Sequence, residues 1–345
     1  MTGFLALEDG TIFRGTSVGA AGSATGEAVF TTGMAGYEEA VTDPSFAEQI
    51  VCFTAPMIGN YGVAPDRAES DRVHARGVLM REARGPDWLD WLRASEVVAL
   101  TGIDTRTLVL RLRESGSLRA CVVAGDALTQ AEAVDEARQL PAMSGRALAR
   151  EVSTDAPFVF AEKGRTRVAV VDYGVKRSVL RRLAVAGAAV TVFPHDVDAD
   201  EVAQYDGVLL SPGPGDPAPL ESETSMVREL LGRTNVLGIC LGHQLIAQAT
   251  DHETFKLPFG HRGTNHPVHD RARNRVLVTS QNHGFAVRAS DAREASHISL
   301  YDETVEGLAY PELRARSLQF HPEAGPGPHD AWALLERWVD EVAHA

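Results

Sequence analysis

The stretch 236-VLGICLGHQLIAQAT-250 contains a strand, a turn and a helix in immediate succession. Its first residues form a short apolar run that suits a buried strand, and its last residues show a helical pattern. Cys240 lies at the junction, between Gly238 and Gly242. This spacing is typical of a sharp turn that presents a nucleophile at the end of a strand. A small cysteine packed inside a strand is the alternative interpretation.

The segments before this unit predict that it belongs to a parallel sheet. Apolar runs alternate with helical patterns from residue 167 onward, and 167-RVAVVDYG-174, 188-AAVTVFPHD-196 and 205-YDGVLLSPGPGDP-217 all read as strands. Such alternation indicates a parallel sheet with right-handed crossovers. Ligands bind beyond the carboxyl ends of such strands, which is where Cys240 is expected. A thiol near a helix N-terminus is also favoured as the thiolate.

The first part of the chain has a different character. Asp9-Gly10 predicts a hairpin within 4-FLALEDGTIFRG-15, and Asp104 or Thr105 is expected to begin a helix that Gly116 ends. We therefore expect an α/β protein with two domains. Residues 1–152 form a β-rich α/β domain, 153–166 a linker, and 167–345 an open, mostly parallel sheet flanked by helices.

Composition excludes several classes of protein. The chain has 345 residues, 44% of them apolar, and a net charge of −14. This charge argues against binding to nucleic acid or to an anionic membrane, because both require clustered positive charge. Three widely spaced cysteines do not form a disulfide framework and suit a reducing compartment. With no signal peptide and no run of about 18 apolar residues, the sequence predicts a cytoplasmic location.

A nucleophilic thiol requires a base, and 318-LQFHPEAGPG-327 provides a candidate. His321 and Glu323 are two residues apart, so in an extended segment they project to the same side. Glu323 is then placed to hold the imidazole while His321 exchanges a proton with the thiol. A surface histidine beside a solvated glutamate is the alternative interpretation.

The loop 211-SPGPGDP-217 follows another predicted strand. Its glycines leave backbone N–H groups accessible, so Gly213 and Leu241 are candidate donors to an oxyanion. A phosphate-binding loop is disfavoured, because the segment lacks the required Gly-Lys-Ser/Thr ending. A plain turn remains the alternative interpretation.

Taken together, GICLGHQ (238–244), PGPGDP (212–217) and HPE (321–323) resemble the motifs of class I glutamine amidotransferases. The segments QNHGFAV (281–287) and FGHRGTNHPV (259–268) resemble, more narrowly, the small subunit of carbamoyl-phosphate synthase. LEDGTIFRG (7–15) and APMIGNYG (55–62) extend this resemblance through the N-terminal half.

The resemblance implies that Cys240 attacks the side-chain amide of glutamine and forms a glutamyl thioester, with His321 and Glu323 completing a triad. It implies a separate, large ATP-binding subunit that receives the ammonia through a tunnel and makes carbamoyl phosphate for pyrimidine and arginine synthesis. ATP and Mg²⁺ are expected only in that partner, and no cofactor in this chain. The implied contacts with glutamine are Ser45, Gly213, Gly215, Leu241, Gln244, Asn282, Gly284 and Phe285.

Some features depart from this pattern. Pro212 stands where carbamoyl-phosphate synthases more often have asparagine, and it is similar to the proline of anthranilate synthase relatives. Asp251 follows the predicted helix where glycine is expected, although aspartate tolerates left-handed geometry. The subunit of another synthase, such as anthranilate synthase, and a catalytically silent regulatory subunit therefore stay open as alternatives.

Histidines outside HPE have less specific signals. His261, His266 and His269 lie close together in sequence but without a cysteine, so we expect no metal site. His243 is interpreted as a buried scaffold residue, and the role of His283 stays open.

Overall fold

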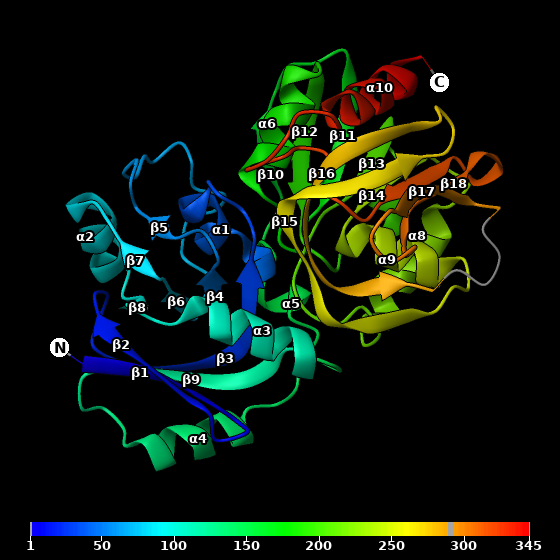
Figure 1. Ribbon diagram of the computed structural model, residues 1–345. Coiled ribbons are helices and arrows are strands. Elements are labelled where there is room, and N and C mark those ends of the chain that lie inside the picture. Colours follow the sequence, from blue (N-terminus) through cyan, green and yellow to red (C-terminus); the bar gives the residue numbers. More distant parts are fainter. Residues whose placement is uncertain (1, 289–292, 345) are drawn as a thin grey trace. The chain divides into compact units, whose positions relative to one another are not determined.

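The computed structural model describes residues 2–288 and 293–344. The chain divides into two compact units (Figure 1). Unit 1 comprises Met1–Met143 and Leu257–Arg262, and unit 2 comprises Ser144–Lys256 and Gly263–Ala345. This division precedes the boundary that the sequence placed at 153–166. It also assigns a short segment of the second half of the chain to unit 1.

Unit 1 is built around a closed barrel. Its strands follow the order β1(Thr2–Leu7), β2(Ile12–Ser17), β8(Val98–Thr101), β6(Gly77–Leu79), β4(Gln49–Phe53), β3(Gly22–Thr31) and β9(Leu118–Ala124). The hairpin predicted at Asp9-Gly10 is confirmed, since β1 pairs antiparallel with β2. Strands β3, β4, β6 and β8 pair in parallel. The closure of the barrel was not predicted.

Helices and short elements complete unit 1. Helix α3(Thr105–Ser115) is confirmed, because the Asp104 side chain accepts a hydrogen bond from the Thr107 N–H and Gly116 follows at φ 83°. The other elements are α1(Tyr37–Thr42), η1(Pro44–Phe46), β5(Met57–Ile58), β7(Glu82–Ala83), α2(Pro86–Ala94) and α4(Gln130–Gln139). Thr129 and Glu132 form a reciprocal capping box at the start of α4.

Unit 2 contains a ten-stranded sheet whose centre is parallel, as the sequence predicts. Its order is β10(Phe158–Ala161), β12(Ala188–Phe193), β11(Thr166–Val171), β13(Gly207–Leu210), β14(Asn235–Ile239), β19(Ala315–Leu318), β18(Val305–Tyr310), β16(Arg275–Val287), β15(Thr254–Asp270) and β17(Ala295–Ser299). The strands from β12 to β19 in this order are parallel, whereas β19 and β18 pair antiparallel.

Helices cover both faces of the parallel strands (Figure 1). Side chains alternate along β11, so Val171 packs toward α8(Glu221–Leu230) and α9(Leu241–Ala249), while Val170 packs toward α6(Arg177–Val185) and α10(Trp332–Ala343). Both faces of the parallel strands are therefore shielded from water, which explains the continuous apolar runs in the sequence. Short helices α5(Ala149–Val152) and α7(Ala199–Val202) and the 3-10 turn η2(Pro311–Leu313) complete the unit.

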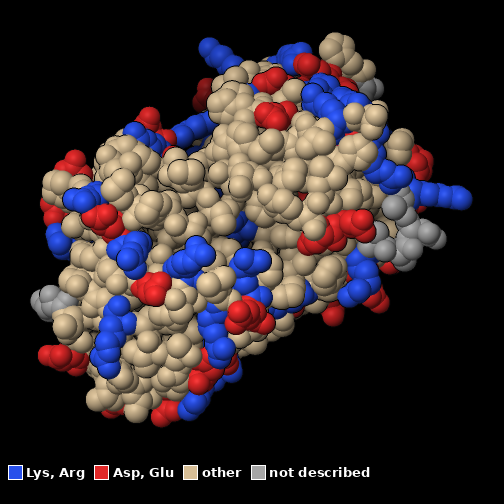
Figure 2. Space-filling model, in the orientation of Figure 1, with Lys and Arg blue, Asp and Glu red and all other residues tan. Residues whose placement is uncertain are grey.

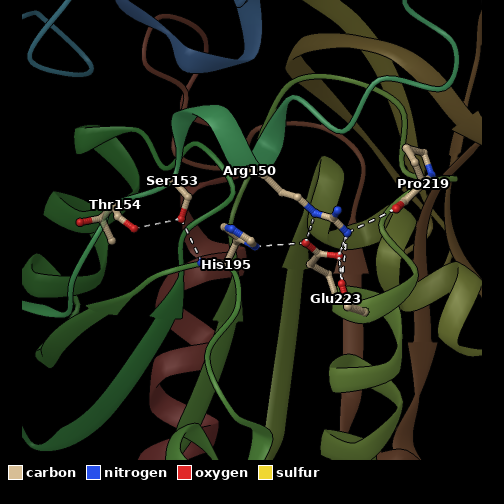
Figure 3. Close-up of polar contacts among 7 residues, drawn as sticks. Arg150, Ser153, Thr154, His195, Pro219 and Glu223 are labelled. Atoms are coloured by element: carbon tan, nitrogen blue, oxygen red, sulfur yellow. Dashed lines mark hydrogen bonds and ion pairs between the residues drawn. The ribbon is translucent and has the colours of Figure 1, made fainter.

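The segment predicted as a linker has structure of its own. Strand β10 pairs antiparallel with β12, which extends the sheet at its edge. Just before it, Arg150 donates to both carboxylate oxygens of Glu223 at 2.7 and 2.9 Å (Figure 3). His195 Nδ1 lies 3.1 Å from the same carboxylate. These contacts attach α5, which precedes the segment, and the loop after β12 to helix α8, and no periodic pattern in the sequence signals them.

The surface mixes both signs of charge. Figure 2 shows acidic and basic side chains interspersed on the face that it displays. Among the helices in the described part of the chain, none is long and apolar enough to cross a membrane.

We predict that Glu223→Gln lowers stability near neutral pH by about 1–2 kcal/mol, a value reduced because the Arg150 side chain is 41% exposed. Burial alone would raise the pKa of Glu223, but the bonds from Arg150 and Ser222 outweigh it and lower the pKa to about 2. A depressed carboxyl pKa stabilises the fold above the unfolded value of 4.5, and this contribution is lost as pH falls toward 2.

Urea unfolding of wild type and Glu223→Gln at several pH values measures this effect. The two proteins should differ most above pH 4.5 and converge in acid. The exposed Glu221→Gln, on the same helix, is the matched control and should match wild type. A difference that is independent of pH would contradict the prediction.

Candidate active site

Cys240 lies in a tight turn between β14 and α9, as the opening stretch predicts. Its backbone has φ 53° and ψ −102°, a conformation that a residue with a side chain rarely adopts. A Cβ added to Gly238 would lie 2.4 Å from the Gly242 carbonyl oxygen, and one added to Gly242 would lie 2.3 Å from the Leu210 oxygen. The two glycines are thus required by backbone packing, which explains their spacing around the cysteine.

The thiol is buried at the carboxyl end of the parallel strands. Cys240 is 2% exposed, and its backbone N–H donates to Leu318 at the end of neighbouring β19. Sγ lies 3.6 Å from the carbonyl oxygen of Asn282 on β16. The side chain therefore lies where the end of β14 meets the adjacent strands.

His321 and Glu323 follow β19, and the structure brings them together. His321 Nδ1 lies 2.8 Å from Glu323 Oε1, and both side chains are buried. The His321 backbone N–H donates to Ser280, while the indole N–H of Trp332 donates to the Glu323 carbonyl. Because a carboxylate only accepts, Nδ1 carries the proton and Nε2 is directed away from Glu323.

Lys176 is a member of this cluster that the sequence analysis missed. Its Nζ lies 2.5 Å from Glu323 Oε1 and 3.3 Å from the Gly325 carbonyl oxygen, and the side chain is 3% exposed. The one available signal was its place after β11, at the carboxyl end of the first parallel strand. Glu323 therefore faces two cationic partners, and a buried carboxylate with such partners stays ionised.

Burial and three neighbouring groups together set the protonation of His321. Burial and the Lys176 ammonium lower its pKa, but the Glu323 carboxylate and the Cys240 thiol outweigh them and raise it well above the ordinary value. Burial raises the pKa of Glu323, while Lys176 and His321 together lower it further than burial raises it. His321 Nε2 makes no hydrogen bond of normal geometry to any described residue. The arrangement suits a histidine that takes a proton from the thiol.

Several predicted glutamine contacts also gather at this end of the sheet. Gln244, on α9, donates through Nε2 to the Phe285 carbonyl at 2.9 Å and to Gln319 at 3.2 Å. Asn282, Gly284 and Phe285 lie on β16. The structure thus joins the nucleophile helix to this strand through Gln244.

The loop after β13 packs against the strand–helix turn at Cys240, called the elbow below. A Cβ on Gly213 would lie 2.1 Å from the Tyr173 carbonyl oxygen and 2.9 Å from the Leu241 side chain. Gly215, at φ 93°, approaches the Arg146 carbonyl oxygen in the same way. The glycines therefore allow close approach of backbone, and the role of the Gly213 N–H as an oxyanion donor stays a prediction.

The remaining candidates have mixed outcomes. Ser45 lies on η1 of unit 1 and is buried, with no partner for its hydroxyl oxygen among the described residues. Its role in binding glutamine stays a prediction.

His243 is fully buried and forms a hydrogen bond with Ser317 at 2.7 Å. Burial lowers the pKa of His243 to about 3, as a neutral scaffold residue requires. His283 contacts the Phe285 carbonyl at 2.7 Å and Gln281 at 2.9 Å, so it orders the predicted glutamine strand. Asp251 adopts φ 64°, the left-handed geometry anticipated for it.

Comparison with known proteins covers nearly the whole chain. Residues 169–340 match the family described as glutamine amidotransferase class-I, and residues 5–122 match the carbamoyl-phosphate synthase small chain, CPSase domain. The carbamoyl phosphate synthase small chain of Syntrophotalea carbinolica is 43% identical, with 99% of this chain and 97% of that protein covered. This chain belongs to the carbamoyl-phosphate synthase small-chain family.

A second small chain and a solved structure are also similar to this chain. The small chain of Pseudomonas syringae pv. tomato is 44% identical over 98% of both proteins. Among solved structures, a glutamine amidotransferase from Thermotoga maritima is similar at a TM-score of 0.36 and 20% identity, covering 46% of this chain and 76% of that one. As a small-chain family member with a class-I domain in unit 2, the protein is an enzyme of the glutamine amidotransferase class.

We predict that Gly238→Ala destabilises the chain by about 2–3 kcal/mol, because its Cβ collides with backbone that cannot move independently. Gly232→Ala is the control, since its added Cβ meets no atom within 4 Å. Its only cost is the backbone strain of a residue with a side chain at φ 81°. Thermal unfolding of both variants makes the comparison. Equal losses of stability would contradict the packing argument.

A second prediction concerns Glu323→Gln. Removing the carboxylate leaves burial and Lys176, which lower the pKa of His321, opposed only by the Cys240 thiol, so this pKa should fall well below its wild-type value. NMR of ¹³C-labelled imidazoles should show His321 protonated at pH 7 in wild type and neutral in the variant. Glu336→Gln, which removes a surface partner of Arg182, is the control. An unchanged His321 titration in Glu323→Gln would refute the assignment of Glu323 as the stabilising charge.

Proposed function

We propose that unit 2 hydrolyses the side-chain amide of glutamine through a thiolate at Cys240. The observation that supports this most is the buried series Lys176, Glu323 and His321 beside a cysteine in a strand–helix elbow. Glu323 holds His321 in one orientation and stabilises its cation. Lys176 in turn keeps Glu323 ionised in a dry environment.

The first half of the reaction forms a thioester. His321 Nε2 takes the proton of the Cys240 thiol, and the sulfur attacks the amide carbon of glutamine. Charge develops on the amide oxygen, for which the backbone N–H groups of Leu241 and Gly213 are the proposed donors. His321 then passes its proton to the departing nitrogen, the carbon–nitrogen bond breaks, and ammonia leaves.

The second half restores the enzyme. Water attacks the thioester carbon while His321 accepts one of its protons. The carbon–sulfur bond breaks and glutamate leaves, which restores the Cys240 thiolate opposite the protonated His321. At the start of the reaction the buried cluster carries two positive charges, on His321 and Lys176, and two negative charges, on Glu323 and the Cys240 thiolate. Its net charge is therefore zero, which limits the free-energy cost of burying it.

For recognition of glutamine, we propose Ser45, Gly213, Gly215, Leu241, Gln244, Asn282, Gly284 and Phe285. Amide and hydroxyl groups together with backbone donors match the polar ends of an amino acid. Gln244 and His283 both contact the Phe285 carbonyl, so they position the strand that presents these groups.

We further propose that the ammonia passes through a tunnel to a large ATP-binding subunit that makes carbamoyl phosphate for pyrimidine and arginine synthesis. The near end-to-end similarity to small chains of carbamoyl phosphate synthase supports this partner over that of an anthranilate synthase. ATP and Mg²⁺ then act in the partner. The three cysteines are unpaired, which fits a cytoplasmic location.

Glutamate release from glutamine tests the proposal. Cys240→Ser should lose at least about 10³-fold in kcat, because the nucleophile and its base act as a unit. Cys52→Ala, a buried cysteine in the barrel of unit 1, should keep wild-type activity. Hydrolysis that survives Cys240→Ser would exclude the thiolate mechanism.

The partner is tested by adding the ATP-dependent large subunit. Wild type should then support glutamine-dependent carbamoyl phosphate synthesis, and Cys240→Ser should support synthesis only from added ammonia. Cysteine-dependent glutamate release without any carbamoyl phosphate would favour the subunit of a different synthase.

A further inference from the structure

A cavity of about 420 Å³ lies in unit 2, away from the proposed catalytic residues. Its wall includes Asn235 and Ala315, which begin the parallel strands β14 and β19. Cys240 and His321 instead follow the carboxyl ends of those two strands. Helix α10, strands β17 and β18 and the rest of β19 provide further lining, and none of the proposed catalytic or glutamine-binding residues is in the wall. Its volume is in the range of small-molecule sites.

The lining carries an excess of positive charge. Among the residues that the structure describes, four arginines, Arg273, Arg314, Arg316 and Arg337, line the cavity together with two carboxylates, Asp270 and Glu341. Arg273 approaches Asp270 at 3.4 Å, and Arg316 pairs with Glu341. In a chain with a net charge of −14, this local excess of positive charge favours an anionic ligand.

Two buried nitrogen atoms in this lining have no partner among the described residues. Nη2 of Arg337 makes no hydrogen bond, and neither does Nε2 of His297, whose residue is 6% exposed. A buried polar atom without a partner costs about 1–3 kcal/mol, and more when it is charged. An acceptor that reached either nitrogen would remove that cost.

The chemistry of both nitrogens suits an anion. Burial lowers the pKa of His297 to about 4, although Asp270 opposes the shift, so its ring is neutral at pH 7. Nδ1 lies 2.9 Å from the Ser296 hydroxyl, and when that hydroxyl donates, the ring proton is on Nε2. The guanidinium of Arg337 is repelled by those of Arg273 and Arg275, which adds to the effect of burial in lowering its pKa. A bound negative charge would relieve this repulsion.

The rest of the wall is apolar. Leucine, valine and tryptophan side chains line it, namely Leu237, Leu308, Leu318, Leu334, Trp338 and Val342. A free inorganic ion would leave these surfaces in contact with water. A ligand with an apolar body would cover them and gain about 25 cal/mol for each Å² removed from water.

We propose that this cavity binds a small organic anion, with its phosphate or carboxylate group on Arg337 and His297 and its apolar body against Trp338 and the leucines. This inference does not depend on the proposed glutaminase activity. The ligand is then either an organic phosphate or an organic carboxylate, and these two classes differ in the group that carries the charge.

Titration calorimetry of the full chain with phenyl phosphate, benzoate and inorganic phosphate tests the site. We expect one saturable site for phenyl phosphate or benzoate, whichever group the site prefers, and weaker binding of inorganic phosphate. Arg337→Gln should weaken that binding about 10-fold or more, because bonds to charged groups contribute about 1.5–3 kcal/mol. Arg337→Lys, which keeps the charge, should recover part of it.

Two further variants test whether the loss of binding comes from the cavity itself. Arg273 is more exposed, so Arg273→Gln should fold normally and still weaken binding. Arg228→Gln removes one positive charge elsewhere in unit 2 and should bind as wild type does. The proposal would be overturned by no saturable binding of either organic anion, or by equal binding in wild type, Arg337→Gln and Arg273→Gln. Inorganic phosphate bound as tightly as phenyl phosphate would also overturn it.

Discussion

The carboxylate of Glu323 is the interaction on which the rest of the candidate site depends. One oxygen faces both His321 Nδ1 and Lys176 Nζ, and all three side chains are buried. A buried charge without partners would be neutralised, so each member of the group requires the others. The group brings together the loop after β11 and the loop after β19, and it orients His321 with its second nitrogen available for the thiol.

Backbone packing imposes the second constraint. The turn at Cys240 brings the chain so close to itself that side chains at Gly238 and Gly242 would overlap backbone atoms. A strained backbone at Cys240 is maintained because the strands on either side and helix α9 are fully packed. Cys240, the proposed nucleophile, is therefore positioned by the packed core of the sheet.

The two ends of the parallel strands differ in chemistry. Beyond the carboxyl ends lies a group of buried, mutually compensated charges around Cys240. Around the amino ends of β14 and β19 lies a cavity with surplus guanidinium groups and unpaired nitrogens. Both places leave buried polar atoms without a hydrogen-bond partner among the described residues, His321 Nε2 and Glu323 Oε2 in the first and His297 Nε2 and Arg337 Nη2 in the second.

Local patterns in the sequence determined much of this protein. The hairpin at Asp9-Gly10, the helix between Asp104 and Gly116 and the parallel strands were readable because turns, caps and buried runs each depend on a few neighbouring residues. The proximity of His321 to Glu323 was readable for the same reason. Features that join distant segments could not be predicted from the sequence. Apolar periodicity shows that a strand is buried, but it does not show which strand lies beside it. Closure of the barrel, the antiparallel extension beyond β19 and the pairing of Lys176 with Glu323 across 147 residues were decided only by the tertiary structure.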